Sequence, residues 1–225
     1  MASQRERVFE FLKLLAIAHE AQPEERIINE EKHIFYNGPS PDEITLVDFA
    51  KNNGLTVSSV SDNECTVWVY PESGLFMKNK ENFNNGHLGD EQEDPENSDS
   101  YDGMNSLASP SKKDLKERIN YEILDFFVHK RIEFTSERKR MSIIVTDPID
   151  GLIKVYIKGA DSIIIDWLSE ESKNDKRMMD KIQLFLQESS TKGFRTLLMG
   201  MKIIDENELK EFKDLLNVAE RDLGA

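Results

Sequence analysis

The sequence has few of the features that mark secreted or membrane-embedded proteins. It contains one cysteine, Cys65, which has no second cysteine with which to form an intramolecular disulfide, as is typical of proteins in a reducing compartment. No stretch approaches the roughly 18 consecutive apolar residues of a transmembrane helix. The first residues mix charges into an apolar pattern, unlike the unbroken apolar centre of a signal peptide. These absences predict a soluble chain in a cytosolic setting.

Basic residues are also scarce. The 225 residues include 29 Lys and Arg against 43 Asp and Glu, which gives a formal net charge of −14. A nucleic-acid backbone needs Lys and Arg gathered on one face, so nucleic acid is not expected as a partner. A small nucleotide needs only a local positive pocket, and the overall charge does not exclude it.

The common short motifs of enzyme active sites are missing. The sequence has no GxxxxGK[ST] phosphate loop, no GxGxxG dinucleotide motif and no GxSxG nucleophile motif. Its four histidines are scattered, and no pair of Cys or His residues has the spacing of a metal site. General motifs therefore predict no catalytic residue and no metal ligand.

What is present is the pattern of a mixed domain. Apolar residues at helical spacing predict helices over residues 5–20, 161–170, 175–191 and 205–222. Alternating and β-branched patterns predict strands within residues 26–36, 55–60, 65–70, 119–134, 140–147, 152–158 and 194–203. Short connections between these strands imply antiparallel pairing. We therefore expect residues 1–225 to form a single α+β domain, in which helices flank an antiparallel β-sheet.

The segment Ser40-Pro41-Asp42-Glu43 predicts the start of a further helix. Ser40 suits the N-cap, Pro41 suits the first helical position, and Glu43 stands three residues after the cap, as the second member of a capping box does. Gly54 is a natural stop for this helix.

Residues 71–117 break the regular pattern. Between His87 and Ser111 there are seven acidic residues and no Lys or Arg. Such a segment has too little apolar content to offset the entropy of ordering it. We expect a mobile, disordered acidic insertion loop within the domain.

Four short segments stand out: Ser40-Pro41-Asp42-Glu43, Phe134-Thr135-Ser136-Glu137-Arg138-Lys139-Arg140-Met141-Ser142, Lys158-Gly159-Ala160-Asp161 and Gly193-Phe194-Arg195-Thr196. Their order and residue types resemble the nucleotide-binding (N) domain of P-type ATPases. The SPDE segment and the FTSxRKRMS form resemble the phospholipid-translocating (flippase) branch of that family. The resemblance extends from about residue 8 to residue 222, interrupted by the insertion. The segment KGA alone would be a weak signal, whereas four segments in the right order are a specific one.

The resemblance implies an ATP-binding site made by Glu43, Phe134, Ser136, Met141, Lys158, Gly159, Arg195 and Thr196. It implies that Phe134 stacks on adenine, an interaction worth roughly 1–3 kcal/mol. Lys158 is implied to line the adenine pocket, and Arg195 to reach the sugar and phosphates through its planar guanidinium. Glu43 is implied to contact the adenine amino group. Gly159 lacks bulk, so a ligand can approach its backbone closely.

Each of these residues also has a purely structural explanation. Phe134 and Met141 are alternatively core residues, and Ser136 is alternatively a turn residue. Lys158 and Arg195 can be solvated surface cations, Arg195 in an ion pair with this acidic chain. The capping position of Glu43 is a sufficient reason for that residue by itself.

The sequence lacks the DKTG, TGD, GDGxND and TGE-like segments of a complete P-type ATPase. The resemblance therefore implies a domain cut out of a larger parent, which binds ATP but has no catalytic residue. In the parent, Mg²⁺ would be held outside this domain, which would present the terminal phosphate to an aspartate of the phosphorylation domain. Its other partners would be the actuator domain and the membrane helices, at the cytosolic face of a membrane. Phospholipid would be the parent's substrate, and the isolated domain is expected to be a monomer.

Two other interpretations remain open from the sequence. The chain can be the N domain of another P-type branch, such as a cation pump, which shares the looser forms of the same segments. It can also be a non-catalytic interaction module with a degenerate pocket, in which the acidic insertion is the contact surface.

Overall fold

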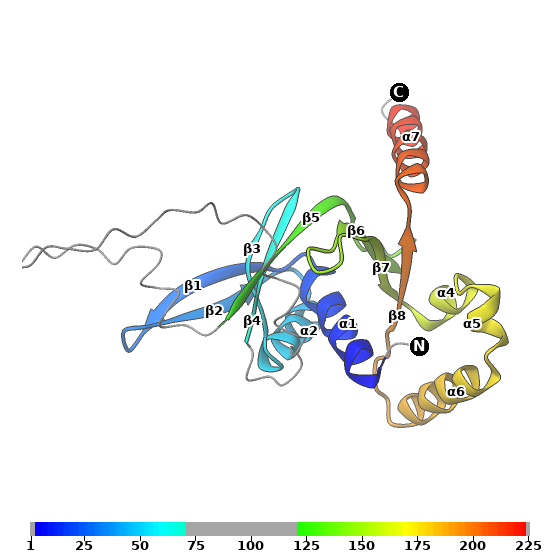
Figure 1. Cartoon of the computed structure of the whole chain (residues 1–225). Coiled ribbons are helices and arrows are strands. Elements are labelled where there is room, and N and C mark those ends of the chain that lie inside the picture. Colours follow the sequence, from blue (N-terminus) through cyan, green and yellow to red (C-terminus); the bar gives the residue numbers. More distant parts are fainter. Residues whose placement is uncertain (1–2, 71–120, 224–225) are drawn as a thin grey trace, which may run out of the picture.

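A computed structural model describes residues 3–70 and 121–223 of the chain (Figure 1). The insertion predicted over residues 71–117 lies outside the described residues. Within these two ranges, no helix is both long enough and apolar enough to span a membrane.

The main element is a six-stranded antiparallel sheet in which the strands follow their order in the sequence. Its strands are β3 (Leu55–Val60), β4 (Glu64–Val69), β5 (Glu122–Ile132), β6 (Arg140–Thr146), β7 (Ile153–Gly159) and β8 (Leu198–Ile204). A separate antiparallel hairpin consists of β1 (Gln22–Ile28) and β2 (Glu31–Asn37). The predicted α+β class with an antiparallel sheet is confirmed.

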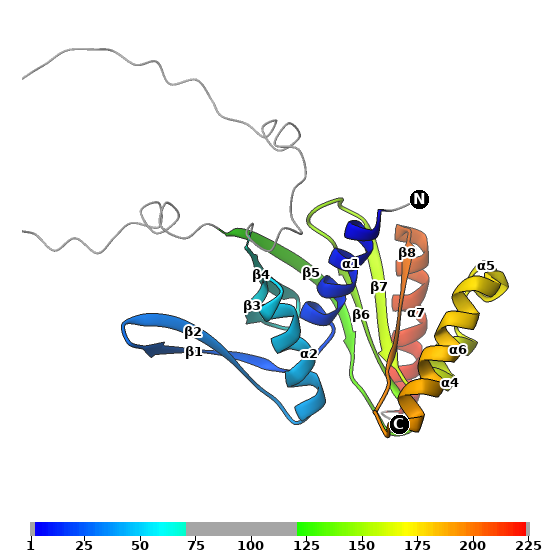
Figure 2. The same cartoon turned by 90° about the horizontal axis from the view of Figure 1, so that it is seen from below.

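The described helices are α1 (Gln4–Ile17), α2 (Pro41–Asn52), α4 (Asp161–Asp166), α5 (Glu170–Asn174), α6 (Lys176–Thr191) and α7 (Glu206–Leu223). Helix α1 packs against α2 and β3. Helices α4 to α6 lie toward the β8 edge of the sheet, and the β1–β2 hairpin lies at the opposite end of the molecule (Figures 1 and 2).

The start of α2 follows the sequence prediction. The Ser40 side chain accepts a hydrogen bond from the Glu43 backbone N–H at 3.4 Å, and Pro41 occupies the first turn. The helix ends at Asn52, and Gly54 has a φ of +92°, a conformation that glycine adopts without strain. The sequence therefore determines both ends of the helix that carries Glu43.

The core lies between the sheet and the first two helices. The last turns of α1 are buried, as are Val47 and Ala50 of α2. Every second residue in the middle of β5, namely Leu124, Phe126 and Val128, is buried in the same cluster. On the other face of the sheet, Ile144, Ile153 and Leu209 form a smaller buried cluster to which α7 contributes.

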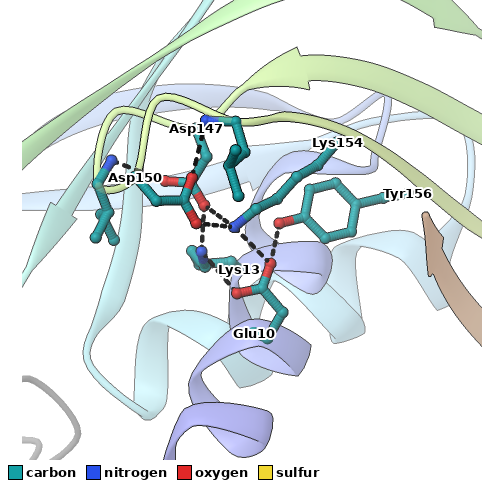
Figure 3. A network of polar contacts seen from close by, with 8 residues as sticks. Glu10, Lys13, Asp147, Asp150, Lys154 and Tyr156 are labelled. Atoms are coloured by element: carbon teal, nitrogen blue, oxygen red, sulfur yellow. Dashed lines mark hydrogen bonds and ion pairs between the residues drawn. The ribbon is translucent and has the colours of Figure 1, made fainter. Parts of the chain in front are cut away.

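An ionic network joins α1 to the β6–β7 hairpin, and it consists of Glu10, Lys13, Asp147, Asp150, Lys154 and Tyr156 (Figure 3). Lys13, Asp147 and Lys154 are buried, whereas Glu10 is partly exposed and Asp150 is exposed. The Lys154 ammonium lies 2.7 Å from the Asp147 carboxylate and 3.3 Å from Glu10, and it also reaches Asp150 at 2.8 Å. Lys13 pairs with both Asp147 and Glu10. Burial alone would raise the pKa of Asp147, but hydrogen bonds from the two lysines lower that pKa below its usual value. The network fixes the position of α1 on the sheet.

Several predicted boundaries were wrong. The helix predicted over residues 5–20 ends at Ile17, and the first strand begins at Gln22 and not within residues 26–36. Residues 161–170, predicted as one helix, form α4, which ends at Asp166, and the beginning of α5. The strand predicted from residue 194 begins at Leu198, because the chain has to leave α6 through Gly193, whose φ is +71°. Strand β5 ends at Ile132, so Phe134 lies in the loop that follows it and not in the strand.

Candidate functional site

The four segments singled out in the sequence meet at one end of the sheet. The β5–β6 loop carries Phe134, the end of β7 carries Lys158, and the first turn of α2 carries Glu43. Met141 of β6 stands directly opposite Lys158 of β7 in the ladder, which joins the second and third segments. Antiparallel pairing thus brings residues that are far apart in sequence to the same end of the sheet.

Glu43 and Lys158 form an ion pair that is almost shielded from solvent. The Lys158 ammonium lies 2.7 Å from Glu43 Oε1, and the two side chains are only 7% and 12% exposed. Removing both groups from water is costly, so each depends on the other for compensation. The side chain of Glu43 therefore contacts Lys158, where the capping-box explanation would have it turn back to the backbone of Ser40.

Phe134 is linked to this pair through Glu20, and the residue is 52% exposed. Its backbone N–H donates a hydrogen bond to Glu20 Oε1 at 3.0 Å. The backbone N–H of Glu20 in turn donates to Glu43 Oε2 at 3.1 Å. Contacts therefore run without interruption from Phe134 through Glu20 and Glu43 to Lys158.

Arg195 belongs to the connection between α6 and β8, and its guanidinium pairs with the Asp42 carboxylate. Both side chains are largely exposed, so the pair lies in water and is weak. Because Asp42 is adjacent to Glu43, this contact brings the fourth segment to the start of α2.

The remaining predicted site residues differ in burial and in structural role. Met141 is completely buried in the main core, whereas Ser136 is exposed in the β5–β6 turn and Thr196 is half-buried. Gly159 has a structural reason of its own, because an added Cβ would lie 2.5 Å from the carbonyl oxygen of Lys139. The tight contact between β6 and β7 thus requires glycine at this position.

Two residues at this end of the sheet, His19 and Glu20, were missed in the sequence. They follow α1 and precede β1, and no motif marks them. The His19 ring is fully buried and contacts the Ala16 carbonyl oxygen at 2.8 Å. Burial, aided by the nearby charge of Lys158, lowers the pKa of His19 to about 4. Neutral at physiological pH, His19 adds no positive charge that would compete with Lys158 for Glu43.

The sequence is similar to that of known proteins of one family. The family model described as "P-type ATPase, cytoplasmic domain N" matches residues 111–223. A phospholipid-transporting ATPase of Schizosaccharomyces pombe is 29% identical over 216 residues, which cover 96% of this chain and 12% of that protein. Phospholipid-transporting ATPase 10 of Arabidopsis thaliana is 30% identical over 209 residues, with 93% and 13% covered. Phospholipid-transporting ATPase ID of Homo sapiens is 26% identical over 205 residues, with 91% and 12% covered.

These relatives are far longer than this chain, which spans between 12% and 14% of their length. The match nevertheless runs through nearly all of this chain, including the hairpin and the first two helices that precede the family-model match. The chain belongs to the family of P-type ATPase cytoplasmic N domains, and its homologues are phospholipid-transporting ATPases.

Proposed function

We propose that this domain binds ATP at the end of the sheet where Phe134, Lys158, Glu43 and Arg195 meet. The observation that carries the proposal is an exposed phenylalanine whose backbone N–H is linked, through Glu20, to a nearly buried lysine–glutamate pair. A solvent-exposed phenylalanine offers a flat face for a base. A shielded ion pair beside it offers both a donor and an acceptor in surroundings where polar contacts are strong.

The roles of the residues follow from their chemistry. Phe134 stacks on adenine, and the carboxylate of Glu43 accepts a hydrogen bond from the exocyclic amino group. Lys158 closes the adenine pocket from the β7 side. Arg195 exchanges Asp42 for the phosphates, since a guanidinium binds phosphate oxygens in a planar, two-pronged contact. Ser136, Gly159 and Thr196 border the site, and Met141 supports it from the core.

In the complete protein, we propose that the bound ATP presents its terminal phosphate to an aspartate of the phosphorylation domain, which drives phospholipid transport. The names of the relatives support phospholipid as the transported substrate, and membership of the P-type ATPase family supports ATP as the ligand. Binding energy on the adenosine part would then position the phosphate for transfer. We propose that Mg²⁺ is held outside this domain in the complete protein, as the family implies.

One stacking aromatic and a few charges make a shallow site. We therefore expect weak ATP binding by the isolated domain, with a dissociation constant on the order of 0.1–1 mM, or about −4 to −5.5 kcal/mol. A nanomolar dissociation constant would be incompatible with this arrangement.

The test is an NMR titration of the domain with ATP, with and without Mg²⁺. We expect saturating shifts at Glu43, Phe134, Lys158 and Arg195. Phe134→Ala is expected to weaken binding by at least about fivefold, the loss of one base–aromatic stack, while the domain stays folded because the residue is half exposed.

Phe127→Ala is the matched control. This phenylalanine is 53% exposed on the strand that leads into the loop, but it faces Thr146 near the other end of β6. Equal affinities for ATP in wild type and in folded Phe134→Ala would refute the stacking role. A flat titration of the folded wild-type domain would favour a non-catalytic interaction module instead.

A further inference from the structure

Glu20 makes two contacts that no known motif of the sequence accounts for. Its carboxylate accepts the backbone N–H of Phe134 at 3.0 Å, and its own backbone N–H donates to the Glu43 carboxylate at 3.1 Å. One residue thus connects the proposed adenine platform with the proposed adenine hydrogen-bonding group. These residues come from three separate parts of the chain: the α1–β1 junction, the start of α2 and the β5–β6 loop.

The backbone of Glu20 is firmly anchored. The three residues before it, Ile17, Ala18 and His19, are all fully buried, and the His19 ring is bonded to the Ala16 carbonyl oxygen at 2.8 Å. Helix α1 itself is fixed to the sheet by the ionic network of Figure 3. A contact from Glu20 therefore transmits the rigidity of the core to whatever it holds.

The residue that it holds has little support of its own. The last ladder pair between β5 and β6 joins Ile132 to Ser142, so Phe134 lies beyond the end of the paired strands. Its backbone N–H is past the reach of that ladder and needs another acceptor. The side-chain oxygen of Glu20 lies within reach of this N–H and supplies the acceptor.

We propose that Glu20 is a positioning residue of the nucleotide site: it holds the Phe134 backbone at a fixed distance from the Glu43–Lys158 pair, so that a base can stack and form its hydrogen bonds at the same time. This inference rests on the proposed ATP binding. It adds Glu20 as a residue that contacts both Phe134 and Glu43. It requires no direct contact between Glu20 and the nucleotide.

The test compares three variants of Glu20 in the same ATP titration. Glu20→Ala removes the acceptor, and Glu20→Asp shortens it by one methylene. Both are expected to weaken ATP binding by about five- to tenfold, in line with the net contribution of a typical hydrogen bond. Glu20→Gln retains an oxygen acceptor at the same reach and is expected to stay within about twofold of wild type.

Two further measurements separate positioning from general damage. The amide proton resonance of Phe134 is expected to move upfield in ligand-free Glu20→Ala and Glu20→Asp, but to stay near its wild-type position in Glu20→Gln. Glu208→Ala is the matched control, because Glu208 also accepts a backbone N–H, that of Asp205, at the start of α7. This control is expected to leave the ATP affinity unchanged.

The outcomes are distinguishable. Wild-type affinity in Glu20→Ala, or an unmoved Phe134 amide, would overturn the role of Glu20 and leave ATP binding intact. If Glu20→Ala fails to fold, Glu20→Asp and Glu20→Gln decide, and equal affinities in these two would overturn the proposal. A wild-type domain that binds no ATP at millimolar concentration would overturn the proposed function, and the inference with it.

Discussion

At the scale of the residue, the ion pair of Glu43 and Lys158 serves stability and binding at once. Neither side chain is more than 12% exposed, so the pair has lost most of its hydration. Removing one member of such a pair leaves an uncompensated buried charge, whereas replacing both members by apolar groups of similar volume is often close to neutral. The site's hydrogen-bonding chemistry is therefore tied to the fold around it.

We predict that Glu43→Ala lowers the free energy of unfolding by about 3–5 kcal/mol, because Lys158 is left buried without its partner. The double variant Glu43→Leu/Lys158→Met is expected to recover most of that loss, yet to bind ATP no better than the single variant. Urea unfolding and the ATP titration measure the two effects separately. Equal stability of Glu43→Ala and wild type would mean that Lys158 reaches water when unpaired.

At the scale of the element, the predictability of the fold depended on how local each signal was. The α2 helix was predicted with both ends, because Ser40 and Gly54 act on their own neighbours. The helix predicted from residue 205 also begins where expected, and there Asp205 and Glu208 form both hydrogen bonds of a capping box. The β8 strand was predicted to begin too early, since its start depends on where β7 ends: Leu198 is the partner of Gly159.

The site was predictable only in part. The resemblance singled out Phe134, Lys158, Glu43 and Arg195, which the structure brings to one end of the sheet. Glu20 was not found, because its contacts join residues more than twenty positions apart in sequence, and its importance comes from the geometry of the α1–β1 junction alone. No periodicity or motif encodes such a contact.

The attachment of α1 yields a second prediction. Asp147 is fully buried and accepts hydrogen bonds from both Lys13 and Lys154. Asp147→Ala is expected to lower the free energy of unfolding by about 3–5 kcal/mol, because two buried lysines lose an anionic partner. Hydrogen exchange should quicken in α1 more than in β4. Equal protection of α1 in the variant would show that apolar packing holds the helix without the network.

At the scale of the whole molecule, stability is expected to fall as the solution becomes acidic. The pKa of His19 is lowered from its ordinary 6.5 to about 4, first by burial and then by Lys158. The unfolded chain therefore takes up a proton below about pH 6.5, whereas the folded chain does so only near pH 4. The contribution of His19 to the free energy of unfolding is constant above this pH range and decreases by about 3 kcal/mol as the pH falls through it.

The measurement is urea unfolding at several pH values between about 7 and 4, the range in which the folded and unfolded chains differ in protonation. His19→Gln should reduce the dependence across this range, and His129, whose pKa is also lowered by burial, contributes to the part that remains. Asp147 also contributes to the pH dependence, because its pKa is lowered in the folded chain. Its contribution to stability is lost in a separate range at lower pH. An identical slope in wild type and His19→Gln would rule out His19 as the source.

A last prediction concerns the division of the chain into one domain with an insertion. Val69 at the end of β4 and Glu122 at the start of β5 are direct ladder partners. Beside them, the ring of Tyr121 stacks on Trp68 with 4.8 Å between centroids. The chain thus leaves the sheet and re-enters it at one point, which a tight hairpin turn can close.

We therefore expect a variant in which an Asn-Gly pair replaces residues 71–120 to fold and to bind ATP within about twofold of wild type, since closing a shorter loop costs less entropy. Circular dichroism and the ATP titration test this. An unfolded variant, or one that is folded but does not bind ATP, would assign the replaced residues a part in the domain itself.

The sequential strand order also has a consequence for how the chain finds its fold. Strands β5, β6 and β7 are joined by short connections, so this meander can form early from local contacts, at little cost in chain entropy. Strand β4 must close the long excursion between Val69 and Glu122, and β8 must close the one that contains α4 to α6. Refolding should thus proceed outward from the three central strands, and shortening the excursion before β5 should speed it in a stopped-flow experiment.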